Sequence, residues 1–119
     1  MQPTRSILII DYETTLANLL VEILIDEGYS AYAVPDGVDA LVAIADELPA
    51  LILLDLGKPT MHGVELVERV RETILATTPM VLMTTAPREA APLSGPGLAE
   101  CLHKPFGLDE LLACVARYL

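Results

Sequence analysis

The alternation of short apolar runs with longer helix-periodic stretches constrains the fold more than any other feature of this chain. The runs predict five β-strands, the last of them the weakest, at Ile7–Ile10, Ala31–Val34, Leu51–Leu54, Met80–Met83 and Glu100–Leu102. Because parallel strands need crossover connections, strict strand–helix alternation predicts a doubly wound α/β sandwich. It would have a five-stranded parallel sheet with helices on both faces.

Between the runs, apolar residues recur at the i, i+3, i+4, i+7 spacing of helices. The four sets are Leu16, Leu19, Leu20 and Ile23; Val38, Leu41, Val42 and Ala45; Gly63, Leu66, Val67 and Val70; and Leu108, Leu111, Leu112 and Val115. Asp36 is placed to cap the second helix and Gly28 to end the first. Residues 86–100 carry Pro92 and Pro96, which predict only a short or distorted helix there.

Length and composition narrow the class of protein. A chain of 119 residues predicts a single domain over residues 1–119. Hydrophobic content is 53%, yet no apolar run is long enough for a membrane helix, so we expect a soluble, cytoplasmic protein. The net charge of −10 disfavours direct binding to nucleic acid and favours a cation or a basic partner. Cys101 and Cys114 are interpreted as reduced structural thiols.

Four polar residues stand at the ends of four predicted strands: Asp11, Asp55, Thr84 and Lys104. Ligands of an open parallel sheet bind at the carboxyl ends of its strands, so these side chains should share one pocket. Two neighbouring carboxylates favour a cation such as Mg²⁺. A carboxylate can also act as a nucleophile toward phosphorus, with an ammonium and a hydroxyl balancing the charge. The set predicts phosphoryl-transfer chemistry.

Three segments resemble response-regulator receiver domains, the phosphorylatable modules of two-component signalling. LILLDLGKPTMHG at residues 51–63 is similar to the phosphoacceptor segment of that family. PMVLMTT at 79–85 resembles its fourth strand with the switch hydroxyl, and GLAECLHKPF at 97–106 resembles its fifth strand with the Lys-Pro-Phe signature. The resemblance covers the whole chain.

The resemblance implies strand order 2-1-3-4-5 and a role for each site residue. Asp55 would accept phosphate from a sensor histidine kinase or a phosphotransfer protein. Asp11, Asp55 and the backbone carbonyl of Gly57 would hold Mg²⁺, while Thr84 and Lys104 would contact the phosphoryl oxygens. The domain would not be an enzyme beyond self-catalysed phosphotransfer and autodephosphorylation. An effector domain or a homodimer would use the face of helix 4, strand 5 and helix 5.

The chain departs from the family pattern at several positions. Tyr12 replaces the second metal-binding acid, and a phenol is a poor Mg²⁺ ligand at neutral pH, so we expect weakened metal binding. Glu13 is a further candidate ligand. Cys101 stands where the family often has an aromatic ring that moves when the switch hydroxyl engages phosphate. Cys101 and His103 share one strand face, but two ligands are too few for a zinc site.

Two alternatives stay open. A pseudo-receiver would use the same fold as a protein-interaction module without phosphorylation, which Tyr12 and Cys101 would explain. A haloacid-dehalogenase-like phosphatase would use Asp11 as its nucleophile. That alternative lacks a late acidic pair at a strand end, because Asp109 and Glu110 fall in the last predicted helix, and it leaves Asp55 unexplained.

Overall fold

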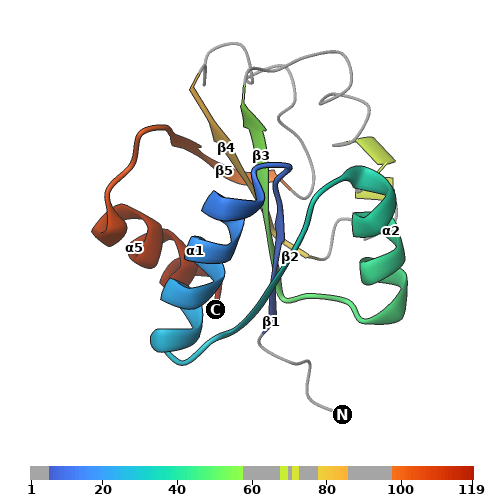
Figure 1. Cartoon of the computed structure of the whole chain (residues 1–119), viewed down its shortest axis with the longest axis horizontal. Helices are drawn as coiled ribbons and strands as arrows, with labels where there is room; N and C mark the ends of the chain where they lie inside the picture. The colour runs from blue at the N-terminus through green and yellow to red at the C-terminus, as the bar shows by residue number, and fades with distance from the viewer. Residues whose placement is uncertain (1–5, 58–67, 70, 73–77, 86–97) are drawn as a thin grey trace.

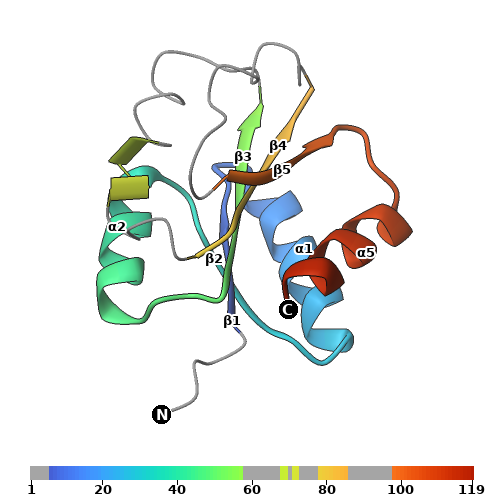
Figure 2. The same cartoon turned by 180° about the vertical axis from the view of Figure 1, so that it is seen from behind.

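The computed structural model describes residues 6–57, 68, 69, 71, 72, 78–85 and 98–119. Its elements are β1 (Ser6–Ile10), α1 (Thr14–Asp26), β2 (Ser30–Val34), α2 (Gly37–Asp46), β3 (Leu51–Gly57), β4 (Met80–Thr84), β5 (Leu98–His103) and α5 (Leu108–Tyr118). The strands form one parallel sheet in the order β2-β1-β3-β4-β5, which confirms the predicted fold class and strand order. Helices cover both faces of this sheet (Figures 1 and 2).

The sheet separates two apolar cores. The larger core packs α1 and α5 against one face, around residues such as Ile7, Leu24 and Val115. The smaller core packs α2 against the other face, around Leu8 and Ile44. Strands β1 and β4 are buried along their whole length, as expected for parallel strands with helices on both sides.

Local sequence explains several element boundaries. The Asp36 carboxylate accepts a hydrogen bond of 2.8 Å from the Asp39 amide, so Asp36 caps α2 as predicted. Gly28 follows α1 with φ of +95°, a conformation that side chains with a Cβ rarely adopt. In the part of the chain that the structure describes, no helix has the length and apolarity needed to cross a bilayer.

Helix α2 turns an unexpected face toward the sheet. Ala40 and Ile44 are its buried residues, whereas Val38, Val42 and Ala45 from the periodic set in the sequence are exposed. The helix therefore has two apolar faces, and the small Ala40 side chain allows the inner one to approach the sheet closely. The periodicity predicted the helix correctly but marked its outer face.

Two predicted segments lie largely outside the described residues. Of the helix expected around residues 63–70, the structure describes residues 68 and 69, which are helical, as are residues 71 and 72. The irregular segment 86–100 is described only from Leu98 onward, where it already belongs to β5.

Candidate functional site

The four predicted strand-end residues come from four elements at the carboxyl edge of the sheet. Asp11 follows β1, Asp55 lies near the end of β3, Thr84 ends β4, and Lys104 follows β5. Each of these strands lies beside the next in the sheet, because β3 pairs with both β1 and β4, and β4 pairs with β5. The topology thus gathers residues that are up to 93 positions apart in the sequence.

An ion pair joins two of these residues directly. The Lys104 Nζ atom lies 2.5 Å from Asp55 Oδ2. The Asp55 side chain is 4% exposed and the Lys104 side chain 21%, so the pair is largely shielded from water. The Lys104 backbone amide also donates a 2.8 Å hydrogen bond to the Thr84 carbonyl, which fixes the start of the loop after β5 against the end of β4.

Asp11 is the second carboxylate of the site and is only 2% exposed. Its Oδ1 atom accepts a 2.9 Å hydrogen bond from the Glu13 amide, while its buried Oδ2 atom has no hydrogen-bond partner. The pKa of Asp11 is raised to about 6, mainly by burial and also by the nearby Asp55 carboxylate, although the hydrogen bond from the Glu13 amide lowers it. Asp11 is therefore a poorly compensated anion at neutral pH.

The backbone between Asp55 and Gly57 is irregular. The register of β3 against β4 shifts between these two residues, so Asp55 pairs with Met83 whereas Gly57 pairs with Thr84. Such a bulge alters the direction of side chains and carbonyl groups at a strand end. Thr84 itself is fully buried. Thr84 and Gly57 thus lie on neighbouring strands, at the same edge of the sheet as the two carboxylates.

The residues of the site fit a divalent cation. Two buried carboxylates face one lysine, and an orphaned carboxylate oxygen on Asp11 lacks a donor. Oxygen donors of this kind are those that Mg²⁺ prefers. Among the described residues, however, no group of three or more His, Cys, Asp and Glu side chains gathers into a metal site. The Glu13 side chain is exposed, and most of the Tyr12 side chain, 73% exposed, contacts water.

The cysteine and histidine residues of β5 are not part of the site formed by Asp11, Asp55, Thr84 and Lys104. Cys101 and His103 are exposed on either side of the buried Leu102, so they share a strand face as predicted. Burial raises the pKa of the Cys101 thiol, and it raises that of the buried Cys114 thiol to about 11. Both thiols are therefore protonated at neutral pH. The buried Cys114 fits its interpretation as a structural residue, whereas Cys101 is exposed.

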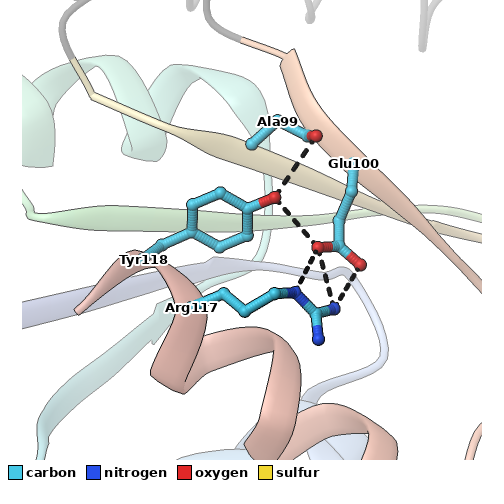
Figure 3. A network of polar contacts seen from close by, with 4 residues as sticks. All are labelled: Ala99, Glu100, Arg117 and Tyr118. Carbon is cyan, nitrogen blue, oxygen red and sulfur yellow. Dashed lines mark hydrogen bonds and ion pairs between the residues drawn. The ribbon is translucent and has the colours of Figure 1, made fainter.

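A second polar cluster, which the sequence did not reveal, joins β5 to α5 (Figure 3). Arg117 donates from Nη2 to Glu100 Oε2 at 2.7 Å and from Nε to Oε1 at 3.1 Å. The Tyr118 hydroxyl donates to Glu100 Oε1 at 2.9 Å and lies 3.3 Å from the Ala99 carbonyl oxygen. The only signal in the sequence was a basic residue in the last turn of a helix, which does not identify a partner 17 positions away.

Comparisons with known proteins agree with this arrangement. The chain is 33% identical over 118 residues to sporulation initiation phosphotransferase F of Bacillus subtilis, covering 97% of this chain and 94% of that protein. It is 35% identical over 109 residues to the transcriptional regulatory protein DltR of Streptococcus agalactiae, covering 90% of this chain and 48% of DltR. The chain thus spans about half the length of DltR.

Solved structures show the same fold. The Thermotoga maritima response regulator TrrA, in complex with Mg²⁺ and BeF, matches with a TM-score of 0.82 and 28% identity over 98% of this chain and 100% of TrrA. Brucella abortus NtrX matches with a TM-score of 0.85 and 28% identity over 98% of this chain and 27% of NtrX. The family model of the response regulator receiver domain matches residues 7–116. The chain therefore belongs to the response regulator receiver domain family.

Proposed function

We propose that Asp55 accepts a phosphoryl group from the phosphohistidine of a sensor histidine kinase or a phosphotransfer protein. The observation that carries this proposal is the 2.5 Å pair between Lys104 and Asp55 beside the buried, poorly compensated Asp11. In the reaction an Asp55 carboxylate oxygen attacks phosphorus. The new P–O bond forms as the P–N bond to the donor histidine breaks, and the released imidazole takes a proton from water.

Each neighbouring side chain has a proposed role in this step. Lys104 first holds the Asp55 carboxylate and then pairs with the oxygens of the transferred group. The Thr84 hydroxyl would donate a hydrogen bond to another of these oxygens. Asp11, Asp55 and the Gly57 carbonyl would hold Mg²⁺, which when bound supplies the positive charge that the two carboxylates and the phosphoryl group require.

The direct test is phosphorylation of the purified chain. Incubation with Mg²⁺ and acetyl phosphate should add the mass of one phosphoryl group, and beryllofluoride should shift amide resonances near Thr84 and Lys104. The Asp55→Asn variant should show neither change, because the amide is not a nucleophile toward phosphorus. An unmodified wild-type chain at millimolar Mg²⁺ would overturn the proposal.

We further propose that Mg²⁺ binding is weak. Support comes from Tyr12, whose phenol stands where the family carries an acid, and from the exposed Glu13 side chain, which remains only a further candidate ligand. A Tyr12→Asp substitution should strengthen Mg²⁺ affinity about tenfold, since it restores a carboxylate beside two others. Isothermal titration of Mg²⁺ checks this effect, and an unchanged affinity would contradict it.

A pseudo-receiver remains the second candidate function. It is favoured by Tyr12 and by the absence of a three-ligand metal cluster among the residues that the structure describes. Failure of both acetyl phosphate and beryllofluoride to act on the wild type would select it. Family membership decides against the phosphatase alternative, and Asp109 and Glu110 lie in the first turn of α5 rather than at a strand end.

The wider setting is also a proposal. Residues 1–119 would act as one receiver domain in the cytoplasm, with neither nucleic acid nor a membrane as a direct partner. An effector domain or a homodimer would use the face of helix 4, β5 and α5, of which β5 and α5 lie in the described part of the chain.

A further inference from the structure

An apolar row on the outside of α2 includes no residue of the phosphoryl site, and of its members Leu41 alone packs against the smaller core. We define the α2 stripe as Val38, Leu41, Val42 and Ala45. Val38 is 73% exposed and Val42 66%, Ala45 is exposed, and Leu41 is half-buried. The stripe lies on the opposite side of the sheet from α1 and α5 (Figures 1 and 2).

The stability of α2 does not account for the stripe. The inner face of the helix, with Ala40 and Ile44, already makes the contact with the sheet. Valine is β-branched and is a poorer helix former than alanine, so Val38 and Val42 disfavour the helix at exposed positions. Because Val38 and Val42 are four residues apart, they lie one turn apart on the same helix surface. There both side chains could make apolar contacts with another molecule.

The segment of the sequence that carries the stripe is acidic. Residues 6–57 contain ten Asp and Glu residues and neither Lys nor Arg, although the whole chain has seven basic residues. Asp39 and Asp46 are exposed and lie seven positions apart, which is about two helical turns. They therefore form an acidic row on one side of Val38 and Val42.

We propose that the α2 stripe docks an amphipathic helix of a partner protein whose apolar seam is bordered by lysine or arginine. The stripe repeats at i, i+3, i+4 and i+7 over roughly 10 Å, a length that matches two turns of a facing helix. A basic border on the partner would meet Asp39 and Asp46, so charge complementarity selects the partner and its orientation. The stripe includes no residue of the phosphoryl site, so docking does not depend on Asp55.

The same charges disfavour other occupants. A second copy carries the same net charge of −10, so repulsion disfavours the pairing of two stripes. A membrane with anionic lipids and a nucleic acid backbone are repelled for the same reason. A helix with an acidic border would be repelled as well, which makes the sign of the partner's charge the specific part of the proposal.

The test uses the full 119-residue chain and a synthetic helical peptide with a leucine seam at i, i+3, i+4 and i+7 flanked by lysines. Titration into the ¹⁵N-labelled chain should shift the amides of α2 most. The double variant Val38→Ala and Val42→Ala should bind about tenfold more weakly and should stay folded, because alanine favours the helix. The double variant Asp39→Asn and Asp46→Asn should also bind more weakly and depend less on salt.

Matched controls separate the stripe from general attraction to an acidic protein. Ile25→Ala removes an exposed apolar side chain from α1 and should leave peptide affinity unchanged. Peptides with serine in the seam, or with glutamate in place of lysine, should not bind. Equal affinity of the wild type and the alanine double variant would overturn the proposal. So would dimerisation of the wild-type chain in sedimentation equilibrium that the same variant abolishes, since a second copy would then occupy the stripe.

Discussion

Two ion pairs near β5 have similar geometry and opposite electrostatic settings. Lys104 and Asp55 pair at 2.5 Å in the interior of the site, whereas Arg117 and Glu100 pair at 2.7 Å between α5 and β5. Asp11 lies close enough to the inner pair to interact electrostatically with both of its members, so one ammonium balances two carboxylates. The outer carboxylate receives donors on both oxygens from Arg117 and Tyr118 (Figure 3).

The pKa values of the carboxyl groups express this difference. Burial raises the pKa of Asp11 to about 6, while hydrogen bonds from Arg117 lower that of Glu100. A group that is more acidic in the folded state stabilises the fold, and one that is less acidic destabilises it at neutral pH. The inner site therefore has an excess of negative charge that a bound cation would neutralise. The outer pair has its charges balanced and holds α5 against β5.

The largest expected difference between the two ion pairs is in the rate of phosphorylation after the basic residue of each is replaced. Lys104→Met should slow phosphorylation by acetyl phosphate about 100-fold, because it deletes the positive charge next to the acceptor. Arg117→Met should leave that rate unchanged within about twofold, since a surface pair contributes little to a distant site. Intact-mass spectrometry over time measures both rates. Equal losses in the two variants would show that the pairs do not differ in role.

The second largest effect should be on the pH dependence of the free energy of unfolding, through Asp11 beside the inner pair. The Asp11 pKa is raised from 3.8 to about 6, so its ionisation destabilises the folded state increasingly as pH rises through that interval. Asp11→Asn should therefore be more stable than wild type by about 3 kcal/mol near pH 7.5, and the difference should vanish below about pH 4. Urea unfolding at several pH values measures this difference.

Addition of Mg²⁺ provides the control for Asp11. It should stabilise the wild type near neutral pH and have a smaller effect on Asp11→Asn, because the variant lacks one of the carboxylates. A constant difference between the two proteins across the pH range would contradict the assigned protonation behaviour of Asp11.

The outer pair should give the smallest effect. Arg117→Met should lower the Tm by a few degrees at low salt and by less at high salt, since the pair is exposed and screened. Because the folded Glu100 pKa is lowered, the stability from this pair should be fully present above the unfolded value of 4.5. It should be lost as pH falls through the folded pKa. In a chain that already carries Glu100→Gln, Arg117→Met should lower the Tm by less than it does in the wild type. An equal decrease in Tm would show that the lost stability does not come from the pair between Arg117 and Glu100.

The alternation of strands and helices, and the polar residues at the strand ends, were predictable from the sequence alone. Apolar runs predicted all five strands, and Asp36 and Gly28 marked helix boundaries, because strand burial and capping are properties of short segments. The order of residues also placed Asp11, Asp55, Thr84 and Lys104 at strand ends, where a parallel sheet must collect them.

The face that each helix buries, and the partners of the charged side chains, follow from the tertiary structure. The periodicity of α2 could not show that Ala40 and Ile44 pack on the sheet while Val38 and Val42 contact water, since both sets fit a helix. Nor could it show the bond between Glu100 and Arg117, or the orphaned oxygen of Asp11. Periodicity is a local property, whereas burial and charge compensation depend on distances between segments that only folding brings together.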